Sequence, residues 1–180
     1  TNNALFLCEQ FSITAPVYRG ADRSVTGEQP EVYPDFVHGI NGLADIQVTV
    51  AGKSAEDQDA CTYLLESSNA KPGEITIIAV GRLTNIAMAL NKDPTFANRV
   101  KEIIFMGGAA TCEGNVTAWA EANIIGDPEA ASIVFNSNIP LVMVGLDVTL
   151  QTRMSQPFVN SLMPDLSPLQ SLLRSINSVY

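Results

Sequence analysis

Three apolar runs between residues 75 and 145 limit the folds that this chain can adopt. Ile75-Thr-Ile-Ile-Ala-Val80 is an unbroken run typical of a strand covered on both faces, and Glu102-Ile-Ile-Phe-Met106 and Ile139 to Gly145 read as two more buried strands. Between them, Thr84 to Leu90 predicts a helix capped by Thr84, and Asp127-Pro128-Glu129 predicts the start of another. Strands that alternate with helices form βαβ units. We therefore expect an α/β fold with a mostly parallel, Rossmann-like open sheet and helices on both faces.

Further helices are predicted outside this alternating region. Thr1 to Phe11 has the apolar spacing of a helix with one buried stripe, and Ser54 with Asp57 resembles a capping box that opens another helix. Ser167-Pro168 predicts the cap of a last amphipathic helix. Arg19 to Asp45 reads as a long loop, and loops of that length in compact domains are usually functional or disordered.

The composition narrows the partners that we expect. The chain has 180 residues, of which 46% are hydrophobic and 16% are charged, so it can form the core of one soluble globular domain. Its formal net charge is −9, which disfavours the phosphate backbone of nucleic acid and anionic lipid surfaces. No apolar run in the sequence is long enough to span a bilayer. Nucleic acid and membrane are therefore not expected as partners.

The cysteines give no sign of a metal site or a disulfide framework. Cys8, Cys61 and Cys112 lie far apart, and His38 is the single histidine, so no zinc site of Cys and His ligands can be assembled. Isolated cysteines are usually small buried hydrophobes, although a nucleophilic Cys–His pair is the alternative. An odd, dispersed set fits reduced thiols, and we expect a cytoplasmic protein.

Polar side chains follow the second predicted strand. Ligands of open α/β sheets bind beyond the carboxyl ends of the strands, and the loop at this end, Ala109 to Gly126, carries Asn115, Glu121 and Asn123. If residues 121–123 are extended, Glu121 and Asn123 point the same way. A carboxylate and two amides that converge suit a ligand rich in hydroxyl groups, such as a sugar. The alternative is that they are ordinary loop residues that form caps and turns.

Eight short motifs occur across almost the whole chain. They are Pro16-Val-Tyr-Arg-Gly20, His38-Gly-Ile-Asn-Gly-Leu43, Gly81-Arg-Leu-Thr-Asn-Ile-Ala87, Met106-Gly-Gly108, Glu113-Gly-Asn-Val-Thr117, Ala120-Glu-Ala-Asn-Ile124, Asp127-Pro-Glu-Ala-Ala131 and Gly145-Leu-Asp-Val-Thr149. In order and spacing they resemble the motifs of the inosine-uridine-preferring nucleoside hydrolases, the calcium-dependent enzymes that cleave a base from ribose. The resemblance implies the nucleoside hydrolase fold, hydrolysis of ribonucleosides to free base and ribose, and a role in purine or pyrimidine salvage.

The resemblance also implies roles for particular residues. Asn115, Glu121 and Asn123 match residues that hydrogen-bond the ribose hydroxyl groups, and Met106 matches a residue that packs against the sugar. Val80 matches the position whose backbone carbonyl ligates calcium, so Ca²⁺ is the implied cofactor.

Several nearby residues have more than one interpretation. His38 matches a loop near the mouth of the pocket, where it either takes part in substrate binding or catalysis or braces the loop. Asp127 is expected to be a helix cap and Asp147 a brace at a strand end, rather than ligands. Trp119 either lines the pocket or packs within its loop. Ala122 replaces a bulky aromatic of the family and is expected to enlarge the sugar pocket.

The resemblance also bears on the extent of the domain. The family's Asp-rich motif, with most of the calcium ligands and the base that activates water, would precede Thr1, and its His-Asp pair would follow Tyr180. We therefore expect residues 1–180 to be a single truncated hydrolase domain, inactive alone and, within the full-length protein, forming a homodimer or homotetramer. The base preference stays open. The alternative function is a non-catalytic nucleoside- or sugar-binding module that has lost the metal site.

Overall fold

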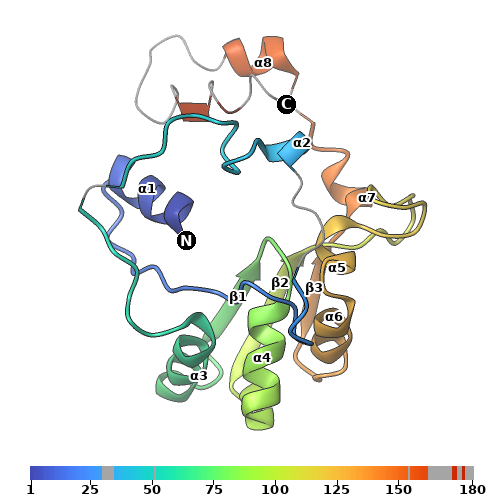
Figure 1. Cartoon of the computed structure of the whole chain (residues 1–180). Helices are drawn as coiled ribbons and strands as arrows, with labels where there is room; N and C mark the ends of the chain where they lie inside the picture. The colour runs from blue at the N-terminus through green and yellow to red at the C-terminus, as the bar shows by residue number, and fades with distance from the viewer. Residues whose placement is uncertain (30–34, 51, 154, 162–171, 174–175, 177–180) are drawn as a thin grey trace. The chain divides into compact units, whose positions relative to one another are not determined.

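The computed structural model of this chain describes residues 1–29, 35–50, 52–153, 155–161, 172, 173 and 176 (Figure 1). The chain divides into two compact units. One consists of Thr1–Arg19, Glu31–Asp57 and Met154–Tyr180, and the other consists of Gly20–Pro30 and Gln58–Arg153. We refer to the second as the sheet unit, because it contains the strands of the structure.

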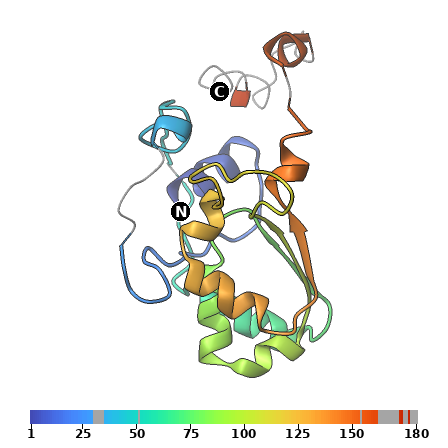
Figure 2. The same ribbon diagram turned by 90° about the vertical axis from the view of Figure 1, so that its right-hand side faces the viewer.

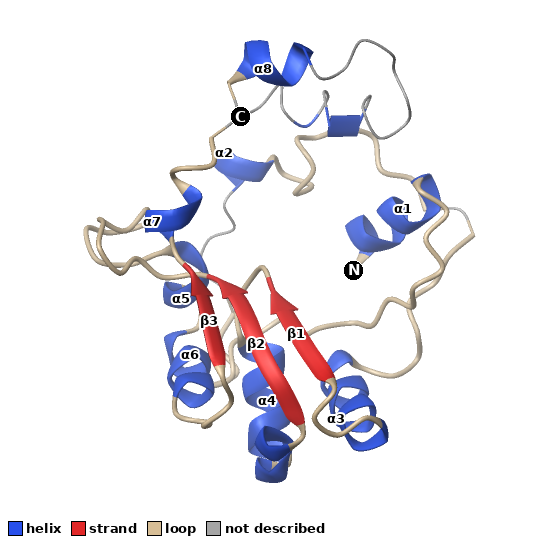
Figure 3. Ribbon diagram, turned by 180° about the vertical axis from the view of Figure 1, so that it is seen from behind, coloured by secondary structure: helices blue, strands red, loops and turns tan. Residues whose placement is uncertain are grey.

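The sheet unit is built on three parallel strands in the order β1-β2-β3 (Figure 3). The strands are β1 (Ile75–Ala79), β2 (Val100–Met106) and β3 (Leu141–Val144). Their register places Ile104 of β2 between Ile78 of β1 and Val142 of β3. The prediction of a parallel, Rossmann-like open sheet is confirmed, and the three strands are those predicted from the apolar runs, with small shifts at their ends.

Helices pack on one face of this sheet, as Figure 2 shows from the side. They are α3 (Ala60–Ala70), α4 (Thr84–Lys92) and α6 (Pro128–Phe135), and a 3₁₀ helix, η1 (Pro94–Asn98), leads from α4 into β2. Side chains from these helices and from the facing side of the strands form one buried apolar core. Its fully buried members include Ala87, Ala89, Phe96, Ile103, Ala130 and Val134.

The opposite face of the sheet remains open in the sheet unit. Ile78 and Val142, which lie on that face on either side of Ile104, are 71% and 45% exposed. Within the described residues of this unit, the packed helices therefore cover one face of the sheet. A run of β-branched residues shows that both faces of a strand are apolar, but it does not specify which segment covers each face.

The start of α3 differs from the sequence prediction. The helix begins at Ala60, and its N-cap is Asp59, whose carboxylate accepts a hydrogen bond from the Thr62 backbone N–H at 2.9 Å. The capping box predicted at Ser54 and Asp57 is therefore wrong. Both Ser54 and Asp59 are suitable cap residues by type, and the local pattern alone did not distinguish them.

The other unit contains α1 (Asn2–Gln10), α2 (Asp35–His38) and α8 (Gln156–Ser161). The predicted first helix is confirmed by α1. The Glu9 carboxylate on this helix accepts hydrogen bonds from the backbone N–H groups of Gly52 and Lys53 at 2.5 and 2.6 Å. The helix predicted after Ser167-Pro168 lies mostly outside the described residues.

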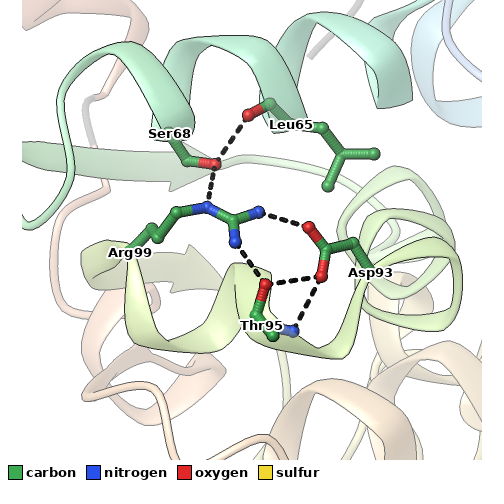
Figure 4. A network of polar contacts seen from close by, with 5 residues as sticks. All are labelled: Leu65, Ser68, Asp93, Thr95 and Arg99. Atoms are coloured by element: carbon green, nitrogen blue, oxygen red, sulfur yellow. Dashed lines mark hydrogen bonds and ion pairs between the residues drawn. The ribbon is translucent and has the colours of Figure 1, made fainter.

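A polar network joins α3, η1 and β2 at the amino end of the sheet (Figure 4). The Arg99 guanidinium donates to Ser68 Oγ at 3.3 Å and to Thr95 Oγ1 at 2.5 Å, and it forms an ion pair with Asp93 Oδ2 at 2.7 Å. Ser68 is fully buried and donates to the Leu65 carbonyl. Hydrogen bonds from the Thr95 hydroxyl and from Arg99 lower the pKa of Asp93. Each of these side chains is thus tied to another or to the backbone.

Candidate functional site

The Glu121 carboxylate lies at the carboxyl end of β2 and is almost fully buried. It is the N-cap of a short helix, α5 (Ala122–Ile125), where Oε1 accepts from the Asn123 N–H at 2.9 Å and Oε2 accepts from the Ile124 N–H at 3.2 Å. Oε2 also accepts from the Gly108 N–H at 2.9 Å, which ties the helix to the end of the strand. Residues 121–123 are therefore not one extended segment, because α5 begins at Ala122. Strand alternation, on which the expected common direction of Glu121 and Asn123 depended, does not apply here.

Asn123 reaches the same strand end from within α5. Its side-chain Nδ2 donates to the Met106 carbonyl at 3.0 Å and lies 3.2 Å from the Met106 sulfur. Because Nδ2 is used in this way, Asn123 Oδ1 is left without a partner among the described residues. The structure thus brings Met106, Glu121 and Asn123 together, although through a helix cap rather than through strand alternation.

Asn115 belongs to the same cluster through a backbone contact. Its Oδ1 accepts from the Ala122 N–H at 3.0 Å, so the side-chain Nδ2 is the group left without a partner in the described part of the chain. Between Asn115 and Glu121 the loop folds back on itself, because Thr117 Oγ1 accepts from the N–H groups of Trp119 and Ala120. Trp119 is 90% exposed, so it does not pack within its loop.

Two glycines allow the close approach of this loop to β2. Gly108 has φ +80°, a conformation that side chains rarely adopt, and a Cβ there would lie 3.2 Å from the Met143 sulfur. A Cβ on Gly107 would lie 3.3 Å from Glu121 Oε2 and 3.2 Å from Ile124 Cδ1. In the sequence this pair was identified only as part of the motif Met106-Gly-Gly108. The left-handed φ and the crowding depend on tertiary contacts.

Asp127 is a buried brace beneath the cluster. Its Oδ1 accepts from the Ala130 N–H at 3.1 Å, which confirms the predicted cap of α6. Its Oδ2 accepts from Thr84 Oγ1 at 2.7 Å and from the Val25 N–H at 2.8 Å. The prediction that Thr84 caps α4 is therefore wrong. The N-cap position is Leu83, and the Thr84 hydroxyl donates to Asp127 instead.

Three further predicted residues lie in different places. Val80 follows β1 directly, at the same end of the sheet, and its side chain is 78% exposed. Asp147 follows β3 in the short helix α7 (Leu146–Thr149), where its Oδ2 accepts from Thr111 Oγ1 at 3.5 Å. His38 is an exposed residue at the end of α2, in the other unit.

The described residues do not by themselves fit a calcium ion. Within the described ranges, no three His, Cys, Asp or Glu side chains gather in a group that could hold a metal. Calcium takes six to eight oxygen ligands, and Glu121, the buried carboxylate of the cluster, already accepts three backbone hydrogen bonds. The Val80 carbonyl is thus the one ligand that the family resemblance assigns within the chain.

The cysteines of the described chain are free thiols, and two of them, Cys8 and Cys61, are buried. Burial in the apolar core raises the pKa of the Cys61 thiol, which disfavours the thiolate needed for nucleophilic attack.

Where the structure describes the chain, it contains no helix of the length and apolar character that a membrane span requires.

Comparison with known proteins gives a consistent result. Residues 1–180 match the family described as inosine-uridine preferring nucleoside hydrolase. Uridine nucleosidase 1 of Arabidopsis thaliana is 44% identical over 156 residues, which are 86% of this chain and 46% of the relative. Pyrimidine-specific ribonucleoside hydrolase RihB of Escherichia coli O1:K1 / APEC is 41% identical over 150 residues, 83% of this chain and 47% of the relative. The chain thus spans about half the length of these curated relatives.

Solved structures agree with this match. The plant nucleoside hydrolase PpNRh1 superposes with a TM-score of 0.95 at 41% identity, over 100% of this chain and 57% of that one. The purine-preferring ribonucleoside hydrolase from Gardnerella vaginalis superposes with a TM-score of 0.94 at 35% identity, over 99% of this chain and 58% of that one.

Proposed function

Because this chain belongs to the inosine-uridine preferring nucleoside hydrolase family, we propose that it supplies the ribose-recognition loop of an enzyme that hydrolyses the N-glycosidic bond of ribonucleosides. The observation that carries the proposal is the convergence of Met106, Glu121 and Asn123 at the carboxyl end of β2. Ligands of open α/β sheets bind at this end. The products would be the free base and ribose.

The hydrogen-bonding groups left over in this cluster match a sugar. Asn123 offers an acceptor, Oδ1, because Met106 holds its Nδ2. Asn115 offers a donor, Nδ2, because its Oδ1 accepts from Ala122. Glu121 Oε1 accepts one backbone bond and retains a lone pair for a second donor. Ribose hydroxyl groups both donate and accept, so they suit a site with both kinds of group.

The same arrangement suggests how these residues favour the reaction. Cleavage of a glycosidic bond passes through an oxocarbenium-like state, in which positive charge develops on the sugar. Hydroxyl groups on that ring become better donors as the charge grows, so their bonds to Glu121 and Asn123 strengthen in the transition state. Glu121 also holds Asn123 and Gly108 in place, which fixes the geometry in advance.

We propose calcium as the cofactor, with the Val80 carbonyl as one of its ligands. The support is the family resemblance and the position of Val80 at the carboxyl end of β1. No step of the reaction is derived through the ion, because the described residues do not complete its ligand set. For the same reason we propose that residues 1–180 alone do not hydrolyse nucleosides.

The remaining properties of the whole protein are also proposals. Relatives carry names that specify uridine, pyrimidine or purine preference, so the base must be determined by assay. We propose a ribonucleoside substrate, a homodimer or homotetramer, and a cytoplasmic location consistent with three free cysteines. His38 is retained as a candidate substrate-binding or catalytic residue, to be tested by His38→Ala.

The test is release of ribose from inosine and uridine by the full-length protein, with calcium and with a calcium chelator. We expect calcium-dependent release, and a decrease of about a hundredfold or more in kcat/KM for Asn123→Ala. Asn136→Ala is the matched control, because Asn136 Nδ2 also donates to a backbone carbonyl, that of Ser132, but outside the loop. Nucleoside binding without ribose release would instead support the non-catalytic binding module.

A further inference from the structure

The two oxygens of the Asp147 carboxylate differ in their hydrogen bonding. Oδ2 accepts from Thr111 Oγ1 at 3.5 Å, whereas Oδ1 is buried and makes no hydrogen bond among the described residues. An unpaired buried carboxylate oxygen costs free energy, and native structures rarely retain one without a function. Because Oδ1 is shielded from solvent, a ligand cannot contact it in this conformation. The feature therefore has to be explained within the chain.

The geometry around Gly145 shows how the carboxylate is held. A Cβ added to Gly145 would lie 2.6 Å from Asp147 Oδ1, so the side chain folds back over the glycine that precedes α7. The same Cβ would lie 3.1 Å from the Gly108 carbonyl oxygen. The orientation of the Asp147 side chain thus depends on the absence of a methyl group at Gly145.

This orientation connects the end of β3 with the start of the candidate loop. Leu146 N–H donates to the Gly108 carbonyl at 2.9 Å, and the Gly108 N–H donates to Glu121 Oε2. Thr111 lies three residues further along, at the start of the loop that carries Asn115 and Glu121. The Asp147 to Thr111 contact is the side-chain bond that joins this start to α7.

We infer that Asp147 is a positioning residue: its Oδ1 is seated over Gly145 so that Oδ2 fixes Thr111 and, through it, the loop of residues 109–126. Its effect on nucleoside binding rests on the proposed function, whereas its effect on the loop does not. A carboxylate and an amide both offer an acceptor oxygen to the Thr111 hydroxyl, so this role requires the oxygen and not the negative charge.

Trp119 provides a direct measurement of the loop. It is the one tryptophan of residues 1–180, it lies in the loop, and it is 90% exposed. The difference in fluorescence anisotropy between each protein and its Trp119→Phe counterpart therefore reports the mobility of residues 109–126. The variants are Thr111→Val, which removes the donor while keeping the shape, Gly145→Ala, which displaces the carboxylate, and Asp147→Asn, which keeps an acceptor oxygen. Thr152→Val is the control, because the Thr152 hydroxyl donates only within its own turn, to Thr149.

We expect Thr111→Val and Gly145→Ala to lower the Trp119 anisotropy and to raise KM for uridine or inosine by about threefold to tenfold, with kcat changed less than about twofold. Asp147→Asn should behave like the wild type in both measurements. In an Asp147→Ala background, Gly145→Ala should cause a smaller further change than it does in the wild type, because the contact with the carboxylate is gone and only the 3.1 Å approaches to the Gly108 carbonyl oxygen and Met143 Cε remain.

Two results would overturn the inference: anisotropy of Thr111→Val and Gly145→Ala equal to that of Thr152→Val, or an Asp147→Asn variant as impaired as the other two. A fall in the anisotropy of these variants, in a full-length protein whose wild type releases no ribose, would uphold the positioning role and reject the proposed hydrolase function, so the two failures are distinguishable.

Discussion

The two ends of the sheet carry polar clusters of opposite kinds. At the amino end, Arg99, Asp93, Thr95 and Ser68 satisfy one another and the neighbouring backbone (Figure 4). At the carboxyl end, Asn115, Asn123 and Asp147 each keep one side-chain atom without a partner in the described chain. A cluster that is fully paired contributes its hydrogen bonds to folding. A cluster that is incompletely paired leaves polar atoms that can bind a ligand or position a neighbouring loop.

The largest expected difference between the two ends is in activity. Glu121→Ala in the full-length enzyme should lower kcat/KM by about a hundredfold or more, because it removes both a transition-state hydrogen bond and the support of Asn123 and Gly108. Asp93→Ala removes a carboxylate of the amino-end network and should change kcat/KM by less than about threefold. Steady-state kinetics with uridine and inosine would check both values.

The comparison fails if the two carboxylates behave alike. Activity of Glu121→Ala within about threefold of the wild type would make Glu121 an ordinary helix cap, as the alternative interpretation of the loop residues held. Glu121→Gln separates the roles further, since it retains one acceptor oxygen for the backbone N–H groups but loses the negative charge.

The second prediction concerns stability at the amino end. Arg99→Met should lower the free energy of unfolding by about 1 kcal/mol, because it removes the donor to the buried Ser68 hydroxyl while it keeps most of the aliphatic stem. The measurement is urea denaturation followed by circular dichroism. If the two ends of the sheet are as different as we propose, kcat/KM of the Arg99→Met variant should stay within about twofold of the wild type.

The third prediction is a pH dependence at the amino side of the sheet unit. Hydrogen bonds from Thr95 and the Arg99 guanidinium lower the pKa of Asp93, and hydrogen bonds from Thr62 lower that of Asp59. The folded state therefore favours the ionised carboxylates. Their stabilisation is complete above the ordinary carboxyl pKa and is lost as the pH falls through the lowered values, below about pH 4.

Urea midpoints measured between pH 6 and pH 2 would check this dependence. Asp93→Asn and Asp59→Asn should each flatten the decline at acid pH and should lower stability at neutral pH. An acid decline as steep in the double variant as in the wild type would assign the pH dependence to other carboxylates.

The smallest expected effect is at Val80. If its carbonyl is a calcium ligand, Val80→Ile should leave calcium affinity of the full-length protein nearly unchanged, since the 78% exposed side chain has room for a methylene group. Val80→Pro should weaken binding, because it constrains the backbone that carries the carbonyl. Calorimetric titration with calcium would distinguish these cases, and strong sensitivity to Val80→Ile would contradict the assignment.

The sequence predicted the strands well and the helix starts less well. The runs at β1, β2 and β3 are apolar and β-branched, and such runs are strong local signals. Asp127 was recognised as a cap because Pro128 fixes the first turn of α6. Asp59 was missed because Ser54 satisfies a similar local pattern. Leu83 was missed because Thr84 is the better cap by type, whereas in the fold the Thr84 hydroxyl donates to Asp127.

The sequence by itself determined the alternating α/β order, the candidate loop after β2 and, through its motifs, the family. It did not determine that Glu121 reaches Gly108 across 13 residues or that Asn123 turns its amide to Met106. It also did not reveal that Asp147 lies over Gly145 with an oxygen unpaired. Periodicity and caps are encoded by neighbours a few residues apart. The direction of a polar side chain depends on which backbone groups the folded sheet brings within hydrogen-bonding distance, and only the tertiary structure decides that.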